Sequence, residues 1–267
     1  MILLKSLFLG TLLIAFSSLA TAQDTTTPTI SSDVKNEVTQ LLNSGALDAE
    51  LEKRLMVVFR AMAKKRSDEQ ASLKNKTQVD QAKAVIKNIP FNYATDHITG
   101  LDNAKFSIIE YADYGCPFCS EFHNTMKTFT EQKPEINWVY RHYPIRGASS
   151  PSSNLAFASE CVSEIGGNDL FWKYNHAVYA DPAAMADSNS FINNFALANN
   201  LNVDDINTCK KSVTTVQKVM NSGKTAQKGQ LSGTPGVIVR NNSTGKLVVL
   251  PGAVKIAAIN NALNSIQ

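Results

Sequence analysis

Apolar and polar positions in the middle of the chain follow the pattern of two buried strands separated by a helix. Residues 106–111 predict a buried strand, and residues 136–143 predict a second strand. Residues 117–132 between them predict a helix. If this helix crosses from one strand to the next, the two strands are parallel.

After the second predicted strand the pattern is helical, and further strands are predicted only near the C-terminus. Residues 151–230 carry only helical signals. The elements predicted after them are two strands and a final helix, at residues 236–240, 246–250 and 254–266. The order therefore predicts an α/β fold over residues 95–267, interrupted by an all-helical insert at about 150–230.

A helical N-terminal extension, residues 23–94, precedes this region. Asp33 predicts the start of a first helix that ends at Gly45, and a second helix is predicted from Asp48. Apolar side chains repeat at helical spacing in the second helix: Leu51, Leu55, Val58, Phe59 and Met62. Residues 63–81 are strongly polar, so this helix either continues in solvent or gives way to a linker.

The apolar stripe of the second helix has two interpretations. It either packs on its own chain or joins copies of the chain, because a short helical pair cannot bury an apolar face alone. We expect a homo-oligomer, a dimer or trimer, formed through residues 33–90.

The first 22 residues have the features of a cleaved signal peptide. Lys5 precedes an apolar run at 7–16, and Ala20-Thr21-Ala22 is a small-x-small cleavage signature. The run is short for a membrane span, which needs about 20 apolar residues; a retained N-terminal anchor is the alternative. The mature chain is then expected to begin at Gln23 and to be secreted into the periplasm, where disulfides persist.

Composition narrows the function classes. The net charge of +3 is small and unclustered, which gives no indication of nucleic acid binding. Hydrophobic residues make up 43% of the chain, enough for a substantial core. In an oxidising compartment all four cysteines are candidate disulfide partners: Cys116, Cys119, Cys161 and Cys209.

Cys116-Pro117-Phe118-Cys119 lies directly between the first predicted strand and the following helix. Pro117 suits the first helical position, which places Cys116 at the helix N-terminus, where the macrodipole stabilises a thiolate. Cys119, one turn further on, is positioned to resolve a mixed disulfide formed by Cys116. The same spacing also occurs as half of a zinc site.

With these residues in place, the chain resembles the DsbA family of exported thiol–disulfide oxidoreductases, which have a thioredoxin fold with a helical insert. Three motifs carry the resemblance: Ile108-Ile-Glu-Tyr-Ala-Asp-Tyr-Gly-Cys-Pro-Phe-Cys119, Phe171-Trp172 and Gly233-Thr234-Pro235-Gly236. It covers roughly residues 95–267 and leaves the extension outside.

The resemblance implies roles for three further residues. Pro235 would be cis, with Thr234 against the active-site sulfurs; the alternative is an ordinary trans-proline turn. Glu110 would be a buried acid that exchanges a proton with Cys119, and burial would raise its pKa. The alternative is a Glu110 side chain that points to the solvent edge of the strand.

The chain departs from the family pattern at Phe118, where the strongest oxidants carry histidine. A phenyl ring cannot stabilise a thiolate as imidazolium does, so a higher Cys116 pKa and a less oxidising couple are expected than in those relatives. His123 either compensates in part or is an ordinary helix-surface histidine, the interpretation we favour.

The resemblance also implies a structural disulfide between Cys161 and Cys209 within the insert. Closing a loop of 48 positions stabilises a fold by roughly 4 kcal/mol. The alternatives are a second redox pair or a four-cysteine zinc site that includes the dithiol.

Together these features predict a protein that oxidises or isomerises disulfides in exported, cysteine-containing proteins. As an oxidase it would need a membrane redox partner, and in neither direction does it need a dissociable cofactor or a metal. The alternative from another class is a non-catalytic binding module that keeps the fold and recognises partners through the apolar stripe.

Overall fold

The structure, a computed structural model, describes residues 36, 40, 49–91, 93–133 and 135–267. The expected signal peptide and most of the first predicted helix lie outside these residues. Two compact units are present, Met1–Glu69 and Gln70–Gln267.

The second predicted helix is α3, which runs from Ala49 to Asn88. Its polar middle is helical and contains no linker, and its exposed side chains form i,i+4 pairs such as Lys64 with Asp68, 2.9 Å apart. The apolar stripe is described at three positions, and these side chains are 43–52% exposed: Val58, Phe59 and Met62.

Five strands form one sheet in the order β1-β3-β2-β4-β5. Their bounds are β1 His97–Thr99, β2 Phe106–Ala112, β3 Ile136–His142, β4 Gly236–Asn241 and β5 Leu247–Pro251. β2 and β3 are parallel, as predicted, with Ile109 opposite Val139. The other three pairings are antiparallel. The three-residue strand β1 was not expected from the sequence.

The two faces of the sheet are covered by different helices. Side chains alternate along β2, so that Ile108 faces one core cluster while Ile109 and Tyr111 face the other. The first face packs against α4 (Pro117–Gln132), α5 (Pro151–Ala180) and α9 (Ile256–Ser265). The opposite face packs against the end of α3 and α8 (Val213–Lys228).

The C-terminal part of α3 belongs to the second unit, although the sequence placed it in the extension. Val85 and Ile89 are buried in the second core cluster. Asn88 Nδ2 donates a hydrogen bond to the carbonyl of Lys228, 2.9 Å away. A Cβ on Gly229 would lie 2.6 Å from Ile89 Cδ1, so any side chain at this position would displace the buried Ile89 side chain.

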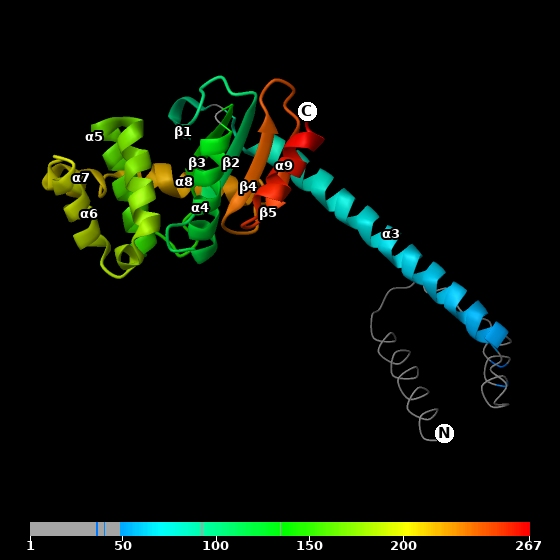
Figure 1. Cartoon of the computed structure of the whole chain (residues 1–267). Helices are drawn as coiled ribbons and strands as arrows, with labels where there is room; N and C mark the ends of the chain where they lie inside the picture. The colour runs from blue at the N-terminus through cyan, green and yellow to red at the C-terminus, as the bar shows by residue number, and fades with distance from the viewer. Residues whose placement is uncertain (1–35, 37–39, 41–48, 92, 134) are drawn as a thin grey trace. The chain divides into compact units, whose positions relative to one another are not determined.

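The insert is all-helical, as predicted, and stands to the left of the sheet in Figure 1. Besides α5 and α8 it contains η2 (Pro182–Met185), α6 (Ser188–Ala198) and α7 (Val203–Cys209). Gly167 interrupts α5 with φ 83°, a left-handed conformation that favours glycine. A short 3₁₀ helix, η1 (Tyr93–Thr95), connects α3 to β1.

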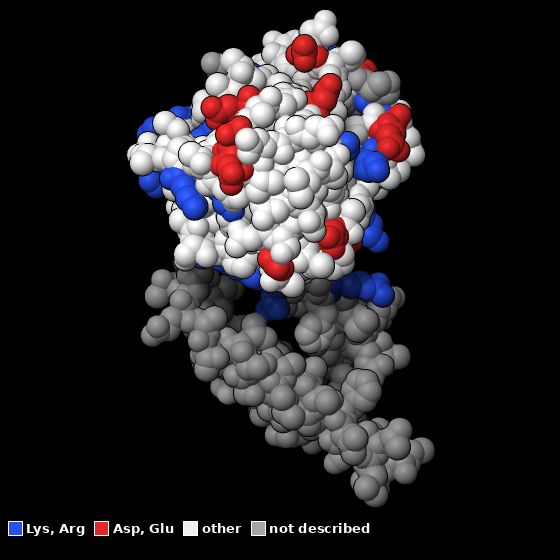
Figure 2. Space-filling view, turned by 90° about the vertical axis from the view of Figure 1, so that its left-hand side faces the viewer, with Lys and Arg blue, Asp and Glu red and all other residues white. Residues whose placement is uncertain are grey.

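Charged side chains are mixed on the face drawn in Figure 2, where acidic and basic groups surround a broad uncharged area and neither sign forms a large patch. Among the described helices, none combines the length and the hydropathy that a membrane span requires.

Candidate active site

Cys116 is the N-cap of α4, and Pro117 occupies the first turn, as the sequence predicts. Asp113 holds the loop before it: Oδ1 accepts a hydrogen bond from Gly115 N at 2.8 Å and Oδ2 accepts one from Ile145 N at 2.9 Å. Both dithiol cysteines are free. No role for Asp113 was predicted from the sequence, although an aspartate two residues before a glycine is a turn signal.

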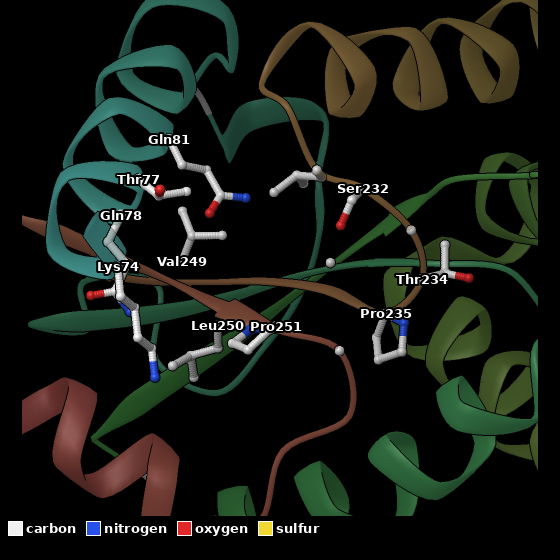
Figure 3. A pocket seen from close by; sticks show the side chains of 14 residues that line it. Lys74, Thr77, Gln78, Gln81, Ser232, Thr234, Pro235, Val249, Leu250 and Pro251 are labelled. Atoms are coloured by element: carbon white, nitrogen blue, oxygen red, sulfur yellow. The ribbon is translucent and has the colours of Figure 1, made fainter. Parts of the chain in front are cut away.

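The loop from β4 reaches the same point. The Thr234–Pro235 peptide bond is cis, as the resemblance implied, and Figure 3 shows both residues in the loop before β4. The Cys116 Sγ lies 3.3 Å from the carbonyl oxygen of Thr234, to which the protonated thiol donates. The fold therefore brings together two motifs that are 118 positions apart.

The two thiols differ in acidity. A hydrogen bond from the Cys119 thiol lowers the pKa of Cys116 from 9.0 to about 5, and the backbone N–H groups of Phe118 and Cys119 act in the same direction against the effect of burial. Burial raises the pKa of Cys119 well above its ordinary value, and the hydrogen bond to Cys116 and the charge of Glu110 reinforce the shift. Cys116 is thus a thiolate near neutral pH while Cys119 remains a thiol.

Glu110 lies beneath the dithiol on the same face of β2 as Ile108. It is fully buried, which excludes the solvent-edge alternative. Burial raises its pKa from 4.5 to about 8, although a hydrogen bond that Trp138 Nε1 donates to Oε2 at 3.1 Å opposes the shift. Its Oε1 has no hydrogen-bond partner among the described residues, so one oxygen remains available to carry a proton.

Phe118 and His123 occupy opposite environments. The Phe118 side chain is 62% exposed beside Cys116. His123 is 2% exposed, so the expectation of a helix-surface histidine is wrong. Its Nε2 lies 2.7 Å from His176 Nδ1, and burial lowers its pKa to about 3. His123 is therefore neutral near pH 7 and brings no charge to the dithiol. Its ring packs against Trp138 in the core.

Comparison with known proteins identifies the family of this arrangement. Residues 92–248 match the thioredoxin family, and residues 20–151 match a thioredoxin-like domain. The first match covers 248 − 92 + 1 = 157 of the 267 residues, more than half of the chain. The chain belongs to the thioredoxin family.

Curated proteins are similar in sequence to parts of this chain, a member of the thioredoxin family. The probable disulfide bond formation protein D of Bacillus anthracis is 26% identical over 166 residues, which are 58% of this chain and 74% of the relative. The Na⁺/H⁺ antiporters NhaA 3 of Salinispora tropica and NhaA 1 of Mycolicibacterium gilvum are 26% and 29% identical over 92 and 91 residues. Those matches cover 34% of this chain, which spans only 14% of the length of either antiporter.

Solved structures show the same fold. Pseudomonas aeruginosa DsbA2 has a TM-score of 0.56 at 24% identity, covering 64% of this chain and 94% of its own. Wolbachia pipientis α-DsbA1 has a TM-score of 0.55 at 21% identity, covering 65% and 91%. A linker-deletion mutant of Proteus mirabilis ScsC has a TM-score of 0.59 at 21% identity, covering 83% and 99%. The predicted thioredoxin fold with a helical insert is confirmed.

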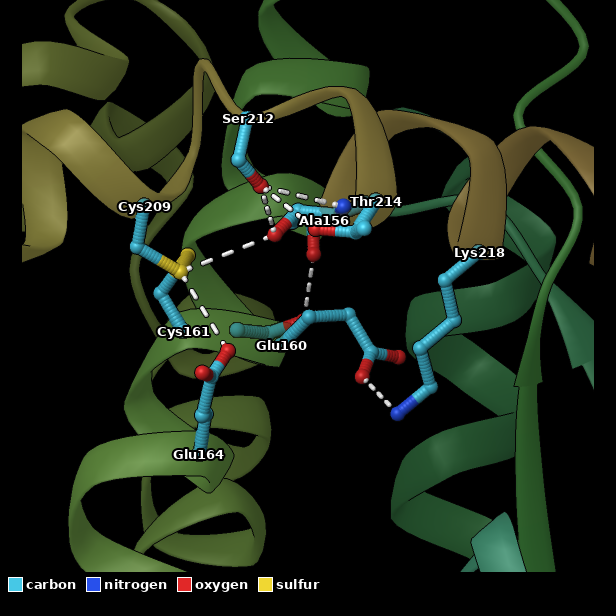
Figure 4. The surroundings of a disulfide bond; sticks show 10 residues. Ala156, Glu160, Cys161, Glu164, Cys209, Ser212, Thr214 and Lys218 are labelled. Carbon is cyan, nitrogen blue, oxygen red and sulfur yellow. Dashed lines mark hydrogen bonds and ion pairs between the residues drawn. A yellow bond between two sulfur atoms is a disulfide. The ribbon is translucent and has the colours of Figure 1, made fainter.

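A disulfide joins Cys161 in α5 to Cys209 at the end of α7, with the two Cα atoms 5.8 Å apart (Figure 4). It was implied by the resemblance and ties two insert helices of the thioredoxin fold together. Because both sulfurs are bonded to each other, the four-cysteine zinc site is wrong.

A different cluster has metal-ligand spacing among the described residues. His97 Nε2 and His142 Nε2 lie 3.0 and 3.2 Å from Glu160 Oε1. Glu160 Oε2 in turn lies 2.5 Å from the ammonium of Lys218, drawn in Figure 4. The half-exposed Lys218 already pairs with the buried carboxylate, and the group links β1, β3 and the insert.

Proposed function

We propose that this chain is a periplasmic thiol–disulfide oxidoreductase that oxidises or isomerises disulfides in exported, cysteine-containing proteins. The observation that carries the proposal is the pairing of a low-pKa Cys116, about 5, with a buried Cys119 whose pKa is raised. Directed disulfide exchange needs one cysteine that is a stable thiolate and a second that ionises less readily, because the thiolate is the form that attacks and leaves.

In oxidation, a substrate thiolate attacks Sγ of Cys116 in the Cys116–Cys119 disulfide. The Cys116–Cys119 bond breaks, a mixed disulfide forms, and Cys119 leaves as a thiolate that takes a proton from Glu110. A second substrate thiolate then attacks the substrate sulfur of the mixed disulfide, and Cys116 leaves as a thiolate. The substrate gains one disulfide and the protein gains two electrons, which a membrane redox partner would remove by the same exchange.

In isomerisation, the reduced protein starts the sequence. The Cys116 thiolate attacks a wrong disulfide, forms a mixed disulfide and releases a substrate thiolate. That thiolate attacks a second bond within the substrate, and Cys116 is released unchanged. If the rearrangement stalls, Cys119 loses its proton to Glu110, attacks Cys116 and frees the substrate in reduced form. No dissociable cofactor takes part in either sequence.

The acidity of Cys116 supports intermediate or mixed activity. Its pKa of about 5 lies between that of the thioredoxin nucleophile, about 7, and that of DsbA, about 3.5. Stabilising the thiolate stabilises the reduced protein and makes its disulfide a stronger oxidant. A couple less oxidising than that of DsbA fits an exposed Phe118 where those relatives carry histidine.

We further propose that α3 joins copies of the chain. Val58, Phe59 and Met62 are exposed on one stretch of helix, and such a stripe is stabilised when another helix covers it. The similarity to the Proteus mirabilis ScsC mutant covers 83% of this chain, against 69% for the ScsC catalytic domain, and so extends into the extension. Light scattering on the mature protein and on Phe59→Glu/Met62→Glu tests this: the variant should be a monomer, with Lys64→Glu as the control.

Two refolding assays test the activity. The oxidised protein should form disulfides in a reduced, unfolded substrate, and the reduced protein should restore activity to a scrambled one. Cys116→Ser should abolish both, while Ser120→Ala, which removes a neighbouring hydroxyl on α4, should keep both. Equal rates for the wild type and Cys116→Ser would contradict the proposal and favour a non-catalytic binding module.

A further inference from the structure

A pocket of about 430 Å³ adjoins the loop of the cis proline. Figure 3 shows its three walls: side chains of α3, the loop before β4, and the end of β5. The α3 wall is held in place, because Gln81 Nε2 donates a hydrogen bond to the carbonyl of Gln230, 3.1 Å away. Two walls thus come from the thioredoxin fold, and the third comes from a helix that precedes it.

The pocket shares the Thr234–Pro235 loop with the active site. Thr234 and Pro235 line it, and the carbonyl of Thr234 lies 3.3 Å from Cys116 Sγ. A polypeptide bonded to Cys116 would therefore begin beside the Thr234–Pro235 wall of the pocket. β5 is an edge strand of the sheet, so one row of its backbone groups faces away from β4 and can bond to an extended segment.

The lining combines apolar side chains with a polar wall that carries one basic side chain. Leu231, Val249 and Leu250 supply the apolar surface, and the α3 side chains are polar. Lys74 is the charged residue among the lining side chains, and no carboxylate lines the pocket. Lys74 is exposed, and it takes part in no ion pair within the described part of the chain. An unpaired ammonium beside an acid-free groove attracts a negatively charged side chain.

We propose that this pocket binds the stretch of substrate polypeptide next to the target cysteine and that Lys74 selects stretches carrying an acidic side chain. The inference rests on the proposed function and adds a substrate class to it. Apolar contacts and the β5 edge hold an extended segment of any sequence, and Lys74 supplies the preference among segments. α3 would then determine which cysteines of an unfolded client react fastest.

Activated peptides test the preference. The full mature protein with Cys119→Ala is mixed with cysteine peptides whose sulfur is bonded to 2-thiopyridine. The Cys116 thiolate attacks the peptide sulfur, a Cys116–peptide disulfide forms, and the departing pyridine-2-thiolate takes a proton and absorbs as 2-thiopyridone. The peptides carry a glutamate, a glutamine or a lysine at each position flanking the cysteine in turn.

The glutamate peptides should react on the order of five-fold faster than the lysine peptides at low salt, with the difference falling at high salt. Lys74→Glu should reverse the preference. Lys83→Glu, on the same helix but outside the pocket lining, should keep it. Equal rates for all peptides, or an unchanged preference in Lys74→Glu, would overturn the inference and leave the proposed function intact. Failure of every peptide to form an adduct would overturn both.

Discussion

The Cys116 sulfur and the Thr234 carbonyl oxygen are 3.3 Å apart across 118 positions of sequence. Through this contact the N-terminus of α4 and the loop before β4 form one surface. Whatever is bonded to Cys116 must lie against that loop. The contact with Thr234 also lowers the pKa of Cys116, so this loop contributes to the acidity of the thiol as well as to the proposed binding of a client.

The reactivity of the reduced protein should follow the acidity of Cys116. Only the thiolate is alkylated, so the rate with iodoacetamide should be at its plateau at neutral pH and fall to half at about pH 5. One thiol should be modified, because Cys119 is fully buried with a raised pKa. Mass spectrometry of the alkylated protein measures both. A midpoint near 9, that of an ordinary thiol, would refute the proposed environment.

Glu110 should make the reduced protein less stable as pH rises. Its pKa is about 8 in the folded state against 4.5 for the free side chain, so folding favours the protonated acid. Its contribution is fully present below pH 4.5 and is lost as pH rises through 8. Glu110→Gln stays neutral and should exceed the wild type by on the order of 3–5 kcal/mol above pH 8.

Urea unfolding of the reduced proteins at pH 5 and pH 9 measures this difference, with the exposed Glu121→Gln on α4 as the control. The same Glu110→Gln protein should resolve mixed disulfides more slowly, by about tenfold or more, because Cys119 loses its proton acceptor. A pH dependence identical to that of the wild type would show that Glu110 is already charged at neutral pH.

Phe118→His should make the dithiol more oxidising. Position 118 is 62% exposed, so the substitution leaves the core unchanged. An imidazolium there would lower the pKa of Cys116 by about one unit, and the reduction potential would rise by about 30 mV. Equilibration with glutathione measures the potential, with Phe118→Gln as the uncharged control. An equal shift in both variants would mean that loss of the ring, and not the charge, is responsible.

Removal of the Cys161–Cys209 disulfide should lower stability and leave exchange intact. The bridge closes a loop of 48 positions, so Cys161→Ala/Cys209→Ala should lose about 4 kcal/mol of unfolding free energy. Urea unfolding measures the loss, and the alkylation rate of Cys116 serves as the activity readout. A large fall in that rate, with the fold retained, would instead indicate a redox role for the pair.

Elements with strong sequence signals could be predicted, and weak ones could not. β2 and β3 are largely apolar segments buried on both faces, and α4 begins at a proline; all three appear within one residue of their expected ends. β1 has three residues at the edge of the sheet, too few to create a pattern. The polar middle of α3 is helical through residue propensity and exposed ion pairs, which hydrophobic periodicity does not report.

Side-chain environments depended on partners that are distant in sequence. The resemblance implied a buried Glu110, and the position of β2 between β3 and β4 supplies the physical reason for its burial. His123 was expected at the helix surface, but it lies on the buried face of α4 with Cys119 and Met126, where Trp138 and His176 contact it. The pocket beside Pro235 could not be foreseen, because its α3 wall lies far upstream in the chain.

The central claim is that Cys116 exchanges disulfides with client proteins, and trapping tests it most directly. Tagged Cys119→Ala protein, expressed with its N-terminal segment, is isolated from acid-quenched cells and separated without reductant. We predict reductant-sensitive adducts through Cys116 with exported, cysteine-containing proteins, and their absence in Cys116→Ala/Cys119→Ala. No adducts above that control would contradict the account.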